Sequence, residues 1–203
     1  ANYLNHFYMV SLFSFIMIFI PAHRAFSLDA RIWPRLRAST APAWTLYWPR
    51  AQIAIVYIFG AVAKLNGDWL QAEPIRMWIA ERSGYPIIGP YLAEPWAGYF
   101  FAYGGLGYDL LIVPLILWRF TRWPALAFSL FFHLTNAYLF NIGIFPWFMV
   151  AIILIYFPPH WPRVVLNRIS GRQATGEQDA APTPSARAQN LIMAGLAVYL
   201  AVQ

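Results

Sequence analysis

The sequence predicts an all-α protein, a multi-pass transmembrane helical bundle with interfacial amphipathic helices. Of its 203 residues, 60% are hydrophobic and 11% are charged, whereas a soluble domain carries about 25% charged residues. The mean hydropathy is +0.50, and the apolar residues come in long runs separated by short arginine-bearing segments. We therefore assign the net charge of +6 to membrane orientation and exclude nucleic acid as a partner.

Six apolar runs define the predicted spans. About 20 apolar residues cross a bilayer, so the stretch from Ala125 to Phe157 is too long for one crossing. We divide it at "FNIGIFP", where Asn, Gly and Pro interrupt the apolar pattern. Five to six spans result, the fifth of them short enough for a half-helix. The runs cover residues 3–20, 51–66, 97–118, 124–141 and 145–157, with a sixth beginning at 191.

The connecting segments complete the predicted organisation. Residues 22–50 and 67–96 each carry three tryptophans among arginines, prolines or glycines, which indicates short helices at headgroup level. The expected domains are a transmembrane core over 1–165, a flexible polar linker over 166–190 and the start of a truncated further span over 191–203. We expect the chain to be a fragment or a trimmed protein.

The distribution of arginine predicts the orientation. Eleven arginines lie in the loops after the first, third and fifth spans, and only Arg76 and Arg82 lie on the opposite face. The positive-inside rule places the eleven in the cytoplasm. His6, Lys64 and Asn141 are then expected on the non-cytoplasmic face.

Several kinds of site are excluded by what the sequence lacks. It has no cysteine, hence no disulfide, thiolate metal site or thiol nucleophile. Its four histidines do not have metal-ligand spacing, so we predict no metal. There is no phosphate-binding loop, and the glycines of "GGLG" (104–107) lie inside a span, where they indicate close helix packing.

Ionisable groups inside spans are costly and are candidates for function. Four occur here: His6, Lys64, Asp109 and His133. His133 and Asn136 lie three residues apart and share a helix face, which Asn141 extends into a polar stripe.

Each of these groups also has a structural interpretation. Lys64 is either an anchor whose ammonium reaches the headgroups or a buried lysine whose free amine takes a proton. His6 is either a hydrogen-bonded structural histidine or a partner that orients the amine or shares its proton. Asp109 needs a partner, which Arg24, Lys64 or a histidine can supply, and a structural ion pair remains open.

Five stretches carry a resemblance to a known family. "LNHFYMVSLFSF", "PAHRAFSLDA", "QIAIVYIFGAVAKLNGDW", "GGLGYDLL" and "FHLTNAYLFNIGIFPWFM" resemble the transmembrane core of the vitamin K-dependent gamma-carboxylase (HTTM) family. The likeness covers about residues 3–165 in the same order along the chain. It identifies the protein as a prokaryotic member of this family or a fragment of one.

The resemblance implies a specific reaction, that of a carbon–carbon lyase coupled to a quinol epoxidase. Family enzymes use reduced vitamin K or a related naphthohydroquinone, with O2 and CO2 as co-substrates and no metal. The deprotonated hydroquinone reacts with O2, and the strong base so formed removes a proton from the gamma carbon of a protein glutamate. The carbanion captures CO2, and the quinone leaves as its 2,3-epoxide.

The same resemblance assigns roles to residues. Lys64 aligns with the family's base, and His6 aligns with the histidine that assists it. The residues expected near the quinone or in support of the base are His133, Asn136, Asp109, Asn141 and Arg24. The animal enzymes carry a large lumenal domain that has no counterpart here, so quinol oxygenation is better supported than carboxylation.

The expected partners are membrane lipid, a quinol and a glutamate-containing protein. The expected location is integral in the membrane, the cell inner membrane for a prokaryotic member, with the active site toward the non-cytoplasmic face. The rival hypothesis is a non-catalytic membrane module that binds quinone or lipid or scaffolds a partner. A transporter is a weaker alternative, because the sequence shows no internal repeat.

Overall fold

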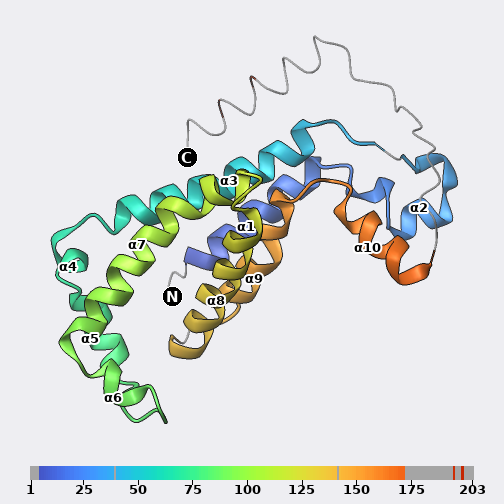
Figure 1. The fold of residues 1–203 in the computed structure, drawn as a ribbon. Coiled ribbons are helices and arrows are strands. Elements are labelled where there is room, and N and C mark those ends of the chain that lie inside the picture. The colour runs from blue at the N-terminus through green and yellow to red at the C-terminus, as the bar shows by residue number, and fades with distance from the viewer. Residues whose placement is uncertain (1–4, 39, 141, 172–193, 195–197, 199–203) are drawn as a thin grey trace. The chain divides into compact units, whose positions relative to one another are not determined.

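The computed structural model describes residues 5–38, 40–140, 142–171, 194 and 198, with only the backbone described at 5 and 6. These residues form helices and no strand (Figure 1). The chain divides into two compact units, residues 1–52 with 157–203 and residues 53–156. The boundary between them falls within α3, and the candidate site lies wholly in the second unit.

The first unit contains one long helix and several short ones. Its first apolar run forms a helix that ends just before Pro21, and Ser27 caps the next α-helix by accepting from the Ala30 N–H at 3.1 Å. The elements are α1 (Asn5–Phe19), η1 (Ala22–Arg24), α2 (Leu28–Ile32), η2 (Pro34–Leu36) and α10 (Trp161–Ser170).

Helix α3 (Trp44–Ala63) begins earlier than the sequence predicted. We expected this span to start at residue 51, after Pro49, and assigned Trp44 and Trp48 to an interfacial segment. The correction has a simple cause: a proline removes one helix hydrogen bond, and here that loss falls near the start of a 20-residue helix. Trp48 packs against Phe19 of α1, with the ring centroids 5.7 Å apart.

The second unit confirms the helices predicted at 97–118, 124–141 and 145–157. Two long runs form α7 (Pro95–Leu117) and α8 (Arg122–Leu139). The predicted half-helix forms α9 (Phe145–Ile152) and η3 (Ile153–Tyr156), and the break predicted at "FNIGIFP" separates it from α8. The segment 67–96 folds into α4 (Gly67–Leu70), α5 (Glu73–Ala80) and α6 (Gly89–Leu92).

These helices pack in a way that leaves a hollow between them. Helix α8 contacts α7 on one side and α9 on another, while α4, α5 and α6 pack against α7 near its beginning (Figure 1). A buried apolar cluster packs the short helices against the end of α8 and forms part of the cavity wall. Its members are Ala72, Ile75, Ile79, Leu92, Ala97, Ala102 and Leu139.

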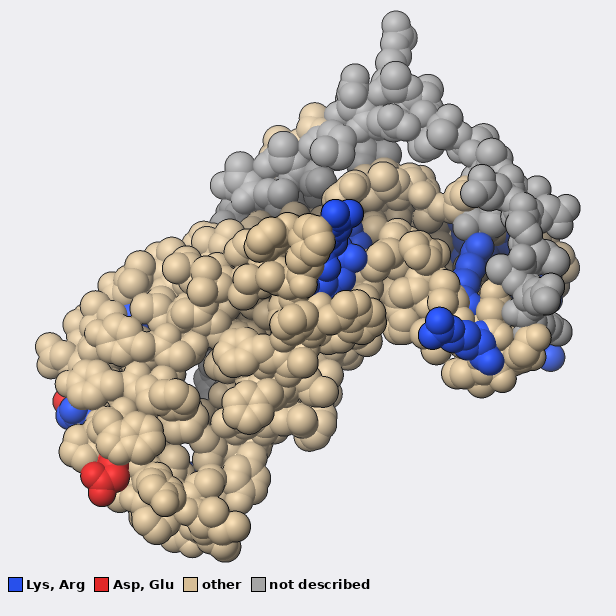
Figure 2. Space-filling model, in the orientation of Figure 1, with Lys and Arg blue, Asp and Glu red and all other residues tan. Residues whose placement is uncertain are grey.

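The surface of this unit is apolar and its interior carries the polar groups. Phe100 and Leu110 of α7 are 64% and 60% exposed, whereas Ser129 and His133 of α8 are buried. Few charged side chains appear on the visible face over α7 and α8 (Figure 2). A helix that exposes large apolar side chains and buries polar ones is suited to lipid rather than to water.

The number of predicted spans exceeds what the described helices support. Two helices, α3 and α7, are long and apolar enough to cross a membrane, and up to four spans result if each of two bent helix pairs counts as one. We predicted five to six. Helix α10 also includes residues 166–170, which we assigned to the linker, while most of the predicted linker and final span lies outside the described residues.

Candidate functional site

The stretch "KLNGDW" forms a sharp corner that turns Lys64 into the bundle. Asn66 makes the corner with both ends of its amide. Its Nδ2 donates to the Ala63 carbonyl at the end of α3, at 2.7 Å, and its Oδ1 accepts from the Trp69 N–H in α4, at 3.0 Å. Because one side chain both closes α3 and caps α4, the position of Lys64 between them is well determined.

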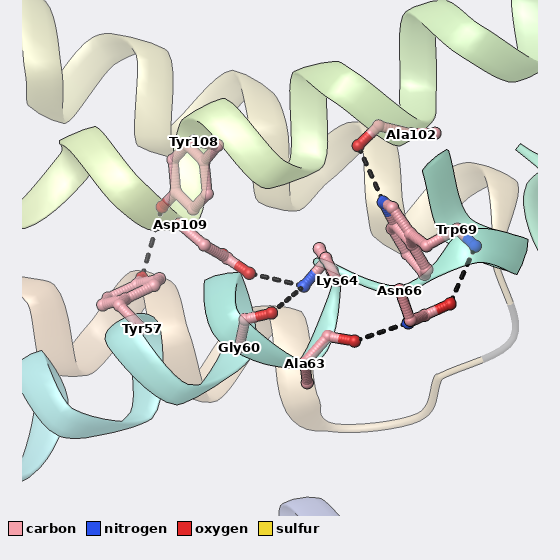
Figure 3. A network of polar contacts seen from close by, with 9 residues as sticks. All are labelled: Tyr57, Gly60, Ala63, Lys64, Asn66, Trp69, Ala102, Tyr108 and Asp109. Atoms are coloured by element: carbon pink, nitrogen blue, oxygen red, sulfur yellow. Dashed lines mark hydrogen bonds and ion pairs between the residues drawn. The ribbon is translucent and has the colours of Figure 1, made fainter. Parts of the chain in front are cut away.

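The Lys64 amine lies against α7. It does not extend away from the protein as the amine of an anchoring lysine would. Its Nζ is 2.5 Å from Asp109 Oδ2 and donates to the Gly60 carbonyl at 3.2 Å (Figure 3). The two paired side chains are 21% and 13% exposed. A snorkelling lysine extends away from the protein to reach headgroups, so this geometry argues against that interpretation. Of the partners we considered for Asp109, the structure selects Lys64.

Trp69 packs against the other side of the Lys64 amine. Its ring centroid lies 5.1 Å from Lys64 Nζ, within range for a cation–π contact. Its Nε1 donates to the Ala102 carbonyl of α7 at 3.0 Å, which fastens α4 to α7 (Figure 3). Our sequence interpretation counted Trp69 only as an interfacial residue, and its position five residues after Lys64 was the available signal.

A second polar centre surrounds His133. Its Nε2 lies 3.0 Å from the Tyr108 hydroxyl and 3.4 Å from that of Tyr57, and the two hydroxyls are 3.2 Å apart. Tyr108 also contacts Ser129 Oγ at 2.7 Å. The buried Nδ1 of His133 has no hydrogen-bond partner among the described residues. Sequence reasoning predicted His133 here but missed the three hydroxyls.

The two centres are joined through consecutive residues of α7. Tyr108 contacts His133 of α8, and Asp109 contacts Lys64 after α3. Successive helix residues point about 100° apart, so α7 presents one group to each neighbouring helix while their Cα atoms stay about 3.8 Å apart. Helix α7 therefore sets the spacing of both centres.

Side chains of both centres line one cavity of about 510 Å³, Lys64 and Asp109 from the first centre and Tyr57 and His133 from the second. This lies in the range of small-molecule sites, roughly 300–1,000 Å³. Asn136 also lines it, and no hydrogen bond of its side-chain amide is found within the described part of the chain. The walls are mostly apolar and include six Trp and Phe side chains: Trp69, Trp78, Phe101, Phe132, Phe140 and Phe145.

Three of the predicted residues are not tested by this cavity. Arg24 is exposed in η1 and belongs to the other compact unit, so its place near the site remains a prediction. The side chain of His6 and the whole of Asn141 lie outside the described residues, and both remain predictions. Among the described residues, no group of three His, Cys, Asp or Glu side chains could hold a metal.

The fold and cavity define an all-helical module with apolar helix faces and an internal cavity of the size of a small molecule. Comparison with known families agrees, because the HTTM domain matches residues 1–161. The chain therefore belongs to the HTTM domain family, whose transmembrane domain is characteristic of the vitamin K-dependent gamma-carboxylase family. No solved structure matches the chain.

Proposed function

We propose that the protein is a membrane quinol-dependent oxygenase of the gamma-carboxylase type, with Lys64 as the base. One observation carries the proposal. The Lys64 amine lies in a mostly apolar cavity with several aromatic walls, 2.5 Å from Asp109 Oδ2. A lysine that passes a proton to a neighbouring carboxylate presents a free amine, which can accept a proton from a substrate.

The cavity fits a naphthohydroquinone by chemistry. Such a ligand has a flat apolar ring system with a hydroxyl at each end, which suits aromatic walls and two separate polar centres. The Lys64–Asp109 pair can meet one hydroxyl. The His133 and Tyr57 side chains, which both line the cavity, can meet the other.

Each residue then has a defined task. Lys64 Nζ accepts the proton of a quinol hydroxyl. Asp109 holds the proton that Lys64 has passed to it. The Gly60 carbonyl and the Trp69 ring keep the amine aligned. The aromatic walls exclude water, which would compete for the proton.

The bound quinol supplies the reducing electrons and the ring that is epoxidised, while one oxygen atom of O2 enters the epoxide and the other leaves as water. Coupling to carboxylation of a glutamate by CO2 is the finer part of the proposal. It rests on family membership.

The test is turnover of a defined quinol by the full chain in detergent or nanodiscs. Chemically reduced phylloquinone is supplied under ¹⁸O2, and labelled epoxide is measured by mass spectrometry. Labelled CO2 and a glutamyl peptide are included in parallel. We expect Lys64→Ala to lower epoxide formation at least about 100-fold, the lower range for loss of a general base.

Arg76→Gln is the matched control, because Arg76 is a cation of the same unit that pairs with Glu73 at 3.4 Å and does not line the cavity. It should keep wild-type turnover. Full turnover by Lys64→Ala would eliminate Lys64 as the base. No epoxide from the wild type would refute the oxygenase proposal.

A second candidate is a quinone-binding module without turnover. The short Lys64–Asp109 contact favours it as well, because an ion pair between two helices can serve structure alone. This candidate predicts that phylloquinone binds, that no epoxide forms, and that Lys64→Ala lowers the melting temperature rather than a rate.

A further inference from the structure

Lys64 is the single lysine of the sequence. Thirteen of the 14 Lys and Arg residues are arginines. An arginine guanidinium stays protonated, whereas a lysine can lose its proton and act as a nucleophile. The sequence therefore has one lysine amine, and the fold places that amine in the wall of the cavity.

The groups around this amine suit a positively charged nitrogen. Asp109 Oδ2 lies 2.5 Å from Lys64 Nζ, the Gly60 carbonyl accepts from it at 3.2 Å, and the centroid of the Trp69 ring is 5.1 Å away (Figure 3). A carboxylate, a carbonyl oxygen and the face of an indole ring all attract a cation. A derivative of the amine that keeps its positive charge can therefore keep these surroundings.

This requirement for charge selects the kind of electrophile that the amine can take. Acylation would turn the Lys64 amine into a neutral amide and leave Asp109, whose side chain is 13% exposed, without a counter-charge. Removing one partner of such a pair is costly. Condensation with an aldehyde gives instead a protonated Schiff base, which keeps the positive charge beside Asp109.

The cavity walls select the body of the ligand. They are mostly apolar, and Trp69, Phe101 and Phe132 are among the aromatic side chains that form them. Aromatic side chains stack with flat rings, and apolar walls exclude hydrophilic molecules. A flat aromatic aldehyde therefore fits this cavity better than a hydrophilic one.

We propose that Lys64 binds a lipophilic aromatic aldehyde covalently, as a protonated Schiff base with Asp109 as its counter-ion. This goes beyond the proposed function, because it requires neither a quinol nor O2. Lys64 Nζ, having passed one proton to Asp109, forms a bond to the carbonyl carbon, and a proton moves from the nitrogen to the carbonyl oxygen. Asp109 then gives its proton to the resulting hydroxyl, water leaves, and the nitrogen lone pair forms the C=N bond.

The test is chemical labelling of the full chain in nanodiscs at pH 7, without quinol, so that it can fail independently of the oxygenase proposal. 2-Naphthaldehyde is added with sodium cyanoborohydride, which reduces the Schiff base to a stable amine, and peptide mass spectrometry locates the label. We expect the label on Lys64. Lys64→Arg keeps the charge without the amine and should lose this label.

Two competitors test whether the cavity is responsible. 2-Methylnaphthalene has the same rings and no carbonyl, so it should slow the labelling of Lys64 by occupying the cavity. Glyceraldehyde is hydrophilic and should label Lys64 more slowly than 2-naphthaldehyde does.

Arg76→Lys is the matched control, because it places a second amine in the same unit but outside the cavity. The Arg76 side chain is 38% exposed and pairs with Glu73 at 3.4 Å. An exposed lysine at pH 7 carries a free amine in only about one molecule in 2,500, so Lys64 should be labelled at least about 10-fold faster than position 76.

Asp109→Asn removes both the acid and the counter-ion, and it should slow the labelling of Lys64 about 100-fold, the lower range for loss of a general acid. The comparison with position 76 decides the proposal even if this variant is unstable. Equal labelling of Lys64 and position 76 overturns the proposal. Labelling that 2-methylnaphthalene does not slow, or no label on Lys64 in the wild type, overturns it as well.

Discussion

Gly60 lies so close to the Lys64–Asp109 pair that a methyl group has no room there. A Cβ at position 60 would lie 2.9 Å from Asp109 Oδ2, 3.5 Å from its Cγ and 3.7 Å from Lys64 Nζ. The first distance is shorter than real Cβ contacts, so the carboxylate must move by several tenths of an ångström. We expect Gly60→Ala to lengthen the pair while leaving the backbone of α3 in place.

The expected effect is on turnover rather than folding. Alanine is favoured over glycine in a helix by about 1 kcal/mol, which offsets part of the cost of moving a flexible carboxylate. A misplacement of about 1 Å in a catalytic group costs up to about 100-fold in rate, so a smaller shift predicts a loss of about 10-fold. The assay is the initial rate of epoxide formation, with the melting temperature measured by tryptophan fluorescence.

Gly105→Ala is the matched control in α7. Its Cβ would lie 3.9 Å from both Lys64 Cε and Trp69 Cζ2, which is an ordinary contact. We expect this variant to keep the rate within about twofold, since ordinary packing displaces no group. Equal rates for the two variants, or a Gly60→Ala protein that loses its fold, would refute the reasoning.

Three further predictions concern the polar groups around the cavity. Asp109→Asn removes the proton-sharing partner of Lys64, and epoxide formation should fall about 100-fold. Tyr108→Phe removes hydroxyl contacts to His133 and Ser129 at 3.0 and 2.7 Å, which should lower the free energy of unfolding by about 1–3 kcal/mol, measured by thermal denaturation. Asn66→Ala removes the cap between α3 and α4, costing about 1 kcal/mol and lowering the epoxidation rate because Lys64 is less well placed.

Each of these has a contradicting outcome. Wild-type turnover by Asp109→Asn would make the ion pair structural only. Tyr103→Phe is the control for Tyr108, because the Tyr103 hydroxyl makes one exposed contact, to the Leu70 carbonyl at 3.2 Å. An equal loss of stability in both would contradict a special role for the buried centre. An unchanged rate in Asn66→Ala would show that the corner does not position Lys64.

Local pattern was enough to predict the main helices. The apolar runs at 97–118 and 124–141 correspond to α7 and α8, and the Asn-Gly-Pro signal placed the break before α9 correctly. These features depend on neighbours within a few residues, since helix periodicity and turn chemistry are local. The start of α3 at Trp44 was not predicted, because a proline such as Pro49 ends some helices and is accepted near the start of others.

The residues of the candidate site also fall into two groups, those that the sequence identified and those that only the structure revealed. Lys64, Asp109 and His133 were identifiable from the sequence, because an ionisable group in an apolar run is rare whatever the fold. Hydroxyl-bearing residues are not rare in such runs, so Tyr57, Tyr108 and Ser129 gave no comparable signal. Their role appeared only when α3, α7 and α8 were seen together.

By itself, the sequence determined that the protein is helical, apolar enough for a membrane and equipped with an amine in an unusual place. Only the tertiary structure decided that this amine meets Asp109, which lies 45 residues away along the chain. It also decided that Arg82 reaches the end of α8, across 57 residues. The physical reason is that an ion pair depends on distance in space, and that distance depends on how whole helices pack.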